Sequence, residues 1–315
     1  MNKLKLRFYL ALTGLALALL IPPVTGMSLY ILTVLILMLI FIIYASAWNL
    51  LAYSGQGSLG HAAFFGIGGY ASSLIALKMG LSPYITIFLG GIFSAFIGIL
   101  IGLTCIRLKE WFLAMVTFGF AIIAQTITVS QLAPITGGWD GIASPRLLSS
   151  EIPFYSIYEY YSILALAILT ILLIQIILKS KIGLALAAIR ENELEARAAG
   201  IDTAKYKLLA FTISTYFTGI AGALEVHHFG YITPEIFGIE LSFWPIIYSI
   251  SGGLGTIGGP IIGTIAVTVL WDGLRILGLT YERFIIIGLM LILIVIFLPH
   301  GFISLLEKKK KLKNA

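Results

Sequence analysis

The sequence predicts an all-α, polytopic membrane protein with about ten transmembrane helices. Of the 315 residues, 59% are hydrophobic and only 11% are charged, and the mean hydropathy is +1.04. The apolar residues are gathered into runs of roughly 20, the length that a helix needs to cross the hydrocarbon of a bilayer. Soluble globular proteins carry about 25% charged residues, so a soluble globule is excluded. We expect residues 1–315 to form one transmembrane domain.

Ten apolar runs are candidates for these helices. They lie near residues 8–21, 28–51, 60–77, 83–106, 111–132, 160–178, 207–229, 243–257, 260–278 and 283–298. The first run follows Lys3, Lys5 and Arg7, as the apolar part of a signal peptide does, but residues 21–26 contain no small-x-small cleavage site. We therefore expect an uncleaved first span.

The basic residues predict the orientation of the spans. Ten crossings place both termini on one side, and all but four of the 20 Lys and Arg residues then fall on that side. The four exceptions are Lys78, Arg146, Arg275 and Arg283. Cytoplasmic loops are enriched in Lys and Arg, so we expect a multi-pass protein of the cell membrane with both termini in the cytoplasm. The basic residues that give the net charge of +6 then orient the spans in the lipid membrane. They indicate no nucleic-acid partner.

The residues needed for covalent or energy-coupling chemistry are missing from the sequence. Its single cysteine, Cys105, excludes an internal disulfide and a cysteine-based metal cluster. No G-x-x-x-x-G-K-[ST] loop is present to hold ATP phosphates. The fourteen acidic residues lie in loops or near the ends of predicted spans, whereas ion-coupled carriers keep costly acids inside the membrane for function. An independent ion-coupled carrier or channel remains the alternative class.

Two glycine-rich segments interrupt the pattern of plain spans, YSGQGSLGH at 53–61 and SGGLGTIGGP at 251–260. Such glycines let helices pack closely or let the backbone turn inside the protein. Alternatively, the broken segments line a translocation path, as discontinuous helices do in transporters. The candidate break or path residues are Gly55, Gln56, Gly57, Ser58, Gly60, His61, Gly252, Gly253, Gly255, Gly258 and Gly259. We expect bulky side chains at Gly57, Gly60, Gly253 or Gly255 to impair assembly or transport.

Several titratable residues have competing interpretations. We expect His61 to be a neutral ring hydrogen-bonded to backbone at the first break, rather than a functional group. Carboxylate and imidazole groups can bind a metal, but we expect the cluster near 225–228 to lie on polar external surface and no metal to bind. That cluster comprises Glu225, His227 and His228. Asp272 and Arg275 are three residues apart and should form an ion pair.

The segment 179–207, KSKIGLALAAIRENELEARAAGIDTAKYK, is the one long charged stretch between apolar runs. Its six basic residues predict a cytoplasmic position. Gly200 suits the left-handed position at which helices end, and Asp202 or Thr203 can cap the next helix. A capped helix around residues 190–199 has apolar and charged positions with which to contact another protein, while the alternative is a solvated loop whose charges serve topology alone.

Six segments that follow one another in order resemble a known family. They are residues 48–70, 136–141, 188–193, 219–224, 252–260 and 299–301. The first contains SLGHAAFFGIG at 58–68, and together they resemble the LivM-type permease subunits of branched-chain amino acid ABC importers. The stretch EARAAG at 195–200 is only loosely similar to the EAA-type loop of other ABC permeases.

The resemblance implies a subunit that translocates leucine, isoleucine or valine delivered by an extracytoplasmic substrate-binding protein. It implies a second, LivH-like permease subunit beside this chain and two ATP-binding subunits that bind the ATP, so that this chain is no enzyme and binds no cofactor. The helix around residues 190–199 would then be the coupling helix. Its candidate residues are Ile189, Arg190, Glu191, Glu193, Leu194, Glu195 and Gly200. The same architecture importing urea or another small polar solute remains an alternative.

Overall fold

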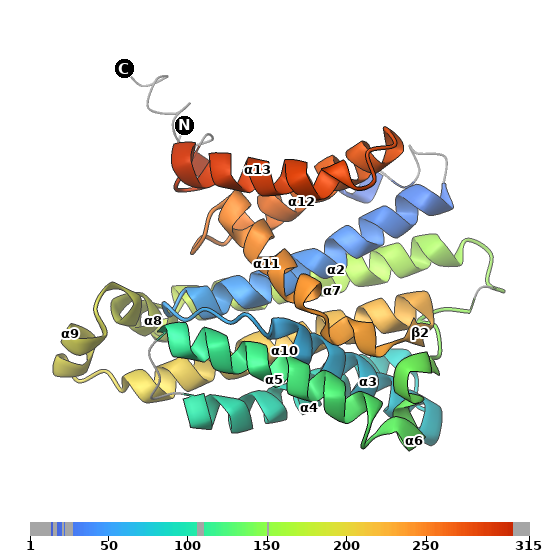
Figure 1. The fold of residues 1–315 in the computed structure, drawn as a ribbon, viewed down its shortest axis with the longest axis horizontal. Coiled ribbons are helices and arrows are strands. Elements are labelled where there is room, and N and C mark those ends of the chain that lie inside the picture. Colours follow the sequence, from blue (N-terminus) through green and yellow to red (C-terminus); the bar gives the residue numbers. More distant parts are fainter. Residues whose placement is uncertain are drawn as a thin grey trace.

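The computed structural model describes residues 14, 18–20, 22, 28–105, 110–149 and 151–304, and it is almost entirely helical (Figure 1). Seven helices in this part of the chain are long and apolar enough to cross a membrane. They are α2 (Leu29–Ala52), α3 (His61–Met79), α4 (Pro83–Cys105), residues 112–129 of α5 (Glu110–Val129), α7 (Tyr155–Lys179), α10 (Thr203–Phe229) and α12 (Gly259–Ile276). The prediction of an all-α polytopic membrane protein is confirmed.

Two further predicted spans form shorter helices. Helix α11 (Ile239–Gly252) has 14 residues and α13 (Glu282–Phe297) has 16. The predicted span 243–257 is displaced, because α11 begins earlier and ends where Gly253 adopts a φ of +135°. The predicted first span, 8–21, lies largely outside the described residues.

Helix α10 runs through the centre of the bundle and packs against α2, α3 and α4. Small residues allow this approach: a Cβ on Gly222 would lie 1.9 Å from the carbonyl oxygen of Phe65, and a Cβ on Gly68 would lie 2.3 Å from Cα of Gly219. Close backbone contact through small residues is typical of helices packed within membranes. The segment 219–224 is therefore a helix-packing surface.

The outer helices expose large apolar side chains. Phe96 and Leu103 on α4, Met115 on α5 and Ile292 on α13 are all more than half exposed. Buried residues of α2, α7 and α10, among them Ile40, Ile163 and Leu224, make up most of the main apolar core. Apolar surface on the outside and a packed interior are expected of a bundle surrounded by lipid.

Short elements close one end of the molecule, opposite to α8 (Lys181–Glu191) and α9 (Glu193–Ala198) (Figure 1). They are α6 (Ala133–Thr136), η1 (Gly138–Asp140), β1 (Ile142–Ala143), β2 (Tyr231–Ile232) and η2 (Pro234–Phe237). The two strands pair antiparallel, with Ile142 opposite Ile232. Gly141 has a φ of +71°, and a Cβ there would lie 2.1 Å from the carbonyl oxygen of Ile232, which explains why residue 141 is a glycine.

Candidate functional site

The first glycine-rich break forms a packed, non-helical connection between α2 and α3. The indole Nε1 of Trp48 donates to the carbonyl oxygen of Ser58 over 2.8 Å, and Ser54 Oγ donates to Oε1 of the buried Gln56 over 3.1 Å. A Cβ on Gly60 would lie 1.7 Å from the carbonyl oxygen of Thr117 on α5. Gly55 has a positive φ of +78°. These polar groups thus find their partners inside the protein.

Gly57 departs from the expectation for this break. A Cβ on Gly57 would meet nothing within 4 Å, so the sequence-based expectation that bulk at residue 57 is harmful through close contact is wrong. Close contact at Gly60 is confirmed.

The second break connects α11 to α12 and is tied to α2. Asn49 donates from Nδ2 to the carbonyl oxygen of Thr256 over 2.9 Å, and its Oδ1 accepts from the N–H of Gly255 over 2.9 Å. A Cβ on Gly252 would lie 1.7 Å from the carbonyl oxygen of Gly259. The turn itself uses φ values of +135° at Gly253 and +69° at Gly255, which glycine adopts without steric cost.

The C-terminal segment 299–301 packs on this second break. A Cβ on Gly301 would lie 2.4 Å from the backbone nitrogen of Gly253. The N–H of Phe302 donates to the carbonyl oxygen of Ser251 over 2.9 Å, and Ile303 lies against Gly258. Sequence segments far apart in the chain therefore converge at one place.

The predicted coupling helix is two short helices. Asn192 ends α8 and caps α9, because its side-chain oxygen accepts from the N–H groups of Leu194 (3.0 Å) and Glu195 (3.3 Å). The expectation of one continuous helix around residues 190–199 is therefore wrong. The positive φ at Gly200, +85°, and the N-cap at Asp202, whose Oδ1 accepts from the N–H of Lys205 over 3.1 Å, are confirmed.

The candidate coupling residues differ in how far their side chains are exposed to solvent. Leu194 is 75% exposed, whereas Ile189 is 4% exposed and packs inside this chain. Glu191 and Glu195 are exposed. Ile189 is thus not accessible as an apolar anchor for another protein, which leaves Leu194 for that role. Arg190 turns toward the breaks, with Cζ 5.5 Å from the centre of the Tyr53 ring.

Glu193 ties α9 to α10. Nζ of the buried Lys207 donates to Oε2 of Glu193, and Arg197 lies 3.3 Å from the other carboxylate oxygen. Burial alone raises the pKa of Glu193, but the hydrogen bond and charge of Lys207, with smaller effects of Thr203 and Arg197, outweigh it and leave the pKa below its ordinary value of 4.5. The carboxylate is therefore charged at neutral pH.

His61 is fully buried at the start of α3, and its partner differs from the one expected. Its Nε2 lies 2.8 Å from Oγ of Ser214, and that hydroxyl donates to the carbonyl oxygen of Ala47 over 2.7 Å. Because the single hydroxyl proton is used in the second bond, Nε2 of His61 is the donor in the first. The ring reaches the backbone through a hydroxyl group, not directly.

The histidines of the 225–228 cluster do not lie on open external surface, which corrects that expectation. His227 is fully buried, with Nδ1 2.6 Å from the carbonyl oxygen of Pro145 and Nε2 2.7 Å from Oγ of Ser72. His228 Nδ1 lies 3.0 Å from Oε1 of the buried Glu159. Among the described residues, no group of three His, Cys, Asp or Glu side chains could hold a metal ion.

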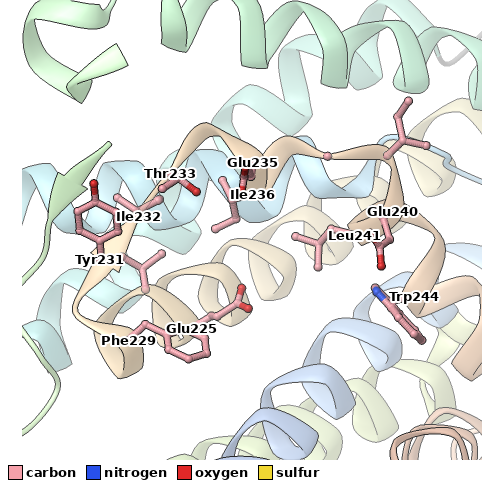
Figure 2. A pocket seen from close by; sticks show the side chains of 13 residues that line it. Glu225, Phe229, Tyr231, Ile232, Thr233, Glu235, Ile236, Glu240, Leu241 and Trp244 are labelled. Carbon is pink, nitrogen blue, oxygen red and sulfur yellow. The ribbon is translucent and has the colours of Figure 1, made fainter. Parts of the chain in front are cut away.

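Glu225 instead faces a cavity of about 520 Å³ (Figure 2). Its walls come from the end of α10, from β2 and η2, and from the start of α11. The lining residues are Glu225, Val226, Phe229, Tyr231, Ile232, Thr233, Glu235, Ile236, Gly238, Ile239, Glu240, Leu241 and Trp244. Apolar walls with carboxylates can receive a small solute that has an aliphatic part and an ammonium group. Apart from Glu225, sequence reasoning did not single out these residues, because they come together only when the chain turns back after α10.

Polar side chains attach the C-terminal end of α12 to α2. Arg275 lies 3.3 Å from Asp272, which confirms the predicted ion pair. Nη2 of Arg275 also donates to the hydroxyl of Tyr30 over 2.7 Å. This end of α12 is therefore attached to the start of α2, while its other end lies at the second break.

Comparison with known proteins indicates the family of the chain. A family model described as "Branched-chain amino acid transport system / permease component" matches residues 30–295. The high-affinity branched-chain amino acid transport system permease protein LivM of Escherichia coli (strain K12) is 30% identical over 304 residues, covering 88% of this chain and 71% of that protein.

Two proteins of one further organism are also similar. The probable LivM permease of Methanocaldococcus jannaschii is 27% identical over 268 residues, covering 76% of this chain and 77% of that protein. The probable LivH permease of the same organism is 26% identical over 208 residues, covering 62% of this chain and 64% of that protein. No solved structure matches the chain. With the match over residues 30–295, the chain belongs to the family of permease components of the branched-chain amino acid transport system.

Proposed function

We propose that this chain is one of two permease subunits of an ABC importer that carries leucine, isoleucine and valine into the cell. An extracytoplasmic binding protein delivers the solute, and two separate subunits bind and hydrolyse ATP. The chain itself performs no covalent chemistry and holds no cofactor. The observation that carries the proposal is the family match over residues 30–295, supported by the relatives named as branched-chain amino acid permeases.

The second permease subunit is proposed to be a LivH-like chain. A LivH permease is 26% identical to this chain over 208 residues, which favours two related subunits. We propose that the two subunits pack side by side with the translocation path between them. The cavity beside Glu225 and Trp244 is our candidate for solute contact on this subunit.

Orientation follows from the charges. We propose that the end with α8 and α9 faces the cytoplasm, because the basic residues of 179–207 belong to it. Both termini are proposed to be cytoplasmic. A cysteine at exposed Leu194 should react with a membrane-impermeant thiol reagent in inside-out vesicles, and one at exposed Leu277 should react in right-side-out cells.

The proposed coupling surface is α9 with its cap. Leu194 provides an exposed apolar side chain, and Glu191 and Glu195 provide exposed charges that can set the register in a groove. Because Glu193 is bonded to Lys207, α9 is attached to α10 and can pass a displacement to the bundle.

The experiment co-expresses the chain with its permease and ATP-binding partners and compares variants. Leu194→Asp and Glu191→Lys should leave membrane insertion intact, weaken co-purification of the ATP-binding subunits, and abolish substrate-stimulated ATP hydrolysis. A cysteine at Glu195 should crosslink to an ATP-binding subunit. Leu277→Asp is the matched control, because Leu277 is 74% exposed against 75% for Leu194 but follows the far end of α12. Normal assembly and transport of the Leu194 and Glu191 variants, with no crosslink, would show the coupling assignment to be wrong.

A further inference from the structure

The guanidinium group of Arg190 lies where α8 meets both glycine-rich breaks. Arg190 is the penultimate residue of α8, and its Cζ is 5.5 Å from the centre of the Tyr53 ring, at the start of the first break. A Cβ on Gly255, in the second break, would lie 2.3 Å from Nη1 of Arg190. The missing side chain at residue 255 thus leaves room for this guanidinium group.

Both of these contacts lead to the same end of α2. Tyr53 is the residue that caps α2. Gly255 donates its N–H to Oδ1 of Asn49, one turn earlier on that helix, over 2.9 Å. A displacement of Arg190 therefore acts on both breaks, and both breaks are attached to the C-terminal end of α2.

Among the described residues, no close ion pair holds Arg190 on the solvent side. Its nearest carboxylate, Glu191, is 3.9 Å away and its side chain is 80% exposed, and an exposed pair at that distance contributes little. The neighbouring Ile189 is 4% exposed, so the end of α8 is packed on the bundle. The guanidinium group faces the breaks while Leu194 and Glu195 face outward.

We propose that Arg190 is a positioning residue for transport, which transmits displacement of the α8–α9 segment to the two breaks and does not itself contact the ATP-binding subunit. This inference rests on the proposed function. The planar cation above an aromatic face can slide or separate without leaving a buried charge unpaired, because the side chain is partly open to solvent at 39% exposure. Such a contact suits an element that changes position in each cycle.

The test uses the complete importer, with both permeases, the ATP-binding subunits and the binding protein in proteoliposomes. Uptake of labelled leucine and ATP hydrolysis are measured in the same sample. For Arg190→Gln we expect unchanged co-purification of the ATP-binding subunits and a drop of about five-fold or more in leucine taken up per ATP hydrolysed. Arg190→Lys keeps the cation above Tyr53 and should restore much of this ratio, which a purely structural role would not predict.

Two further variants sharpen the test. Tyr53→Leu should lower the ratio as Arg190→Gln does, and the double variant should be no worse than the poorer single one, because both remove the same contact. Lys205→Gln removes an exposed cation from the start of α10 and should leave the ratio unchanged.

Three outcomes would overturn the proposal. An unchanged ratio in Arg190→Gln would show that the contact transmits nothing. Loss of the ATP-binding subunits from that variant would make Arg190 a docking residue instead. Failure of the unmodified chain to recruit any ATP-binding subunit would overturn the proposed function as well, and it would be evident before any variant is compared.

Discussion

At the residue scale, Gly60 and Gly57 offer a matched pair within one break. A methyl group on Gly60 would meet the backbone of Thr117 at 1.7 Å, whereas one on Gly57 would meet nothing within 4 Å. We expect Gly60→Ala to destabilise the purified complex by about 1–3 kcal/mol, as overpacking does. Gly57→Ala should change stability by no more than about 0.5 kcal/mol. Thermal unfolding in detergent measures both, and equal midpoints for the two variants would contradict the close contact at Gly60.

Asn49 is the second residue whose replacement has a defined expected result. It is 2% exposed and makes two hydrogen bonds to the second break. Asn49→Ala leaves the N–H of Gly255 and the carbonyl of Thr256 without this partner and should cost about 1–3 kcal/mol. Asn49→Asp retains the acceptor for Gly255 but turns a carboxylate oxygen toward the carbonyl oxygen of Thr256 and buries a charge, so its unfolding temperature should be no higher than that of the Ala variant. An Asp variant as stable as the unmodified chain would show that the hydrogen bond to Thr256 contributes nothing.

At the element scale, attachment of α9 to α10 should depend on pH through Glu193. Its pKa in the folded protein is below the ordinary value of 4.5, so the stabilisation from its ionised form is fully present above pH 4.5 and is lost as the pH falls through the lower, folded value. Hydrogen-exchange protection factors for α9 should therefore stay constant from neutral pH to about pH 5 and decline below 4.5.

The matched variants separate the two partners of this pair. Glu193→Gln should weaken protection of α9 and remove its dependence on acid. Lys207→Met should raise the pKa of Glu193, because the hydrogen bond and the charge of Lys207 are the main causes that lower it. Protection that still declines with acid in Glu193→Gln would assign the titration to another group.

The helix boundaries between α8, α9 and α10 show what the sequence can and cannot predict at this scale. Gly200 and Asp202 end and begin helices as their local preferences predict. Asn192 does the same, but it lies within residues 190–199, which contain no Gly or Pro, and we predicted one helix across it. Capping by an Asn within a helical pattern depends on the backbone angles of the preceding turn, which composition does not reveal.

At the scale of the whole molecule, the chain should move no solute by itself. The sequence contains no phosphate-binding loop, and the buried acid Glu159 is paired with His228. Purified alone in liposomes, the chain should show no leucine uptake above that of empty vesicles under a proton or sodium gradient, and uptake should appear only with the partner subunits and ATP. Uptake by the single chain would favour the ion-coupled carrier.

Composition and run length were sufficient for the fold class, because crossing a bilayer restricts the backbone to few solutions. The positions of the two breaks were predicted too, since dense glycine in an apolar chain has few other uses. The convergence of Tyr53, Arg190, Gly255 and Gly301 could not be predicted, because each belongs to a different segment and only tertiary packing brings them together. The burial of His227 and the lining of the cavity beside Glu225 depend on the same long-range packing.

The adjacency of Trp48 and Asn49 has a consequence for how the chain tolerates changes in length. Trp48 bonds to the first break and Asn49 to the second, so inserting one alanine between them would rotate one side chain about 100° away from its loop. Such an insertion should abolish assembly, as judged by co-purification with the partner subunits. An alanine inserted between the exposed Glu151 and Ile152 should be tolerated. Natural relatives should accordingly differ in length in the connection before α7 and keep the last turn of α2 uninterrupted.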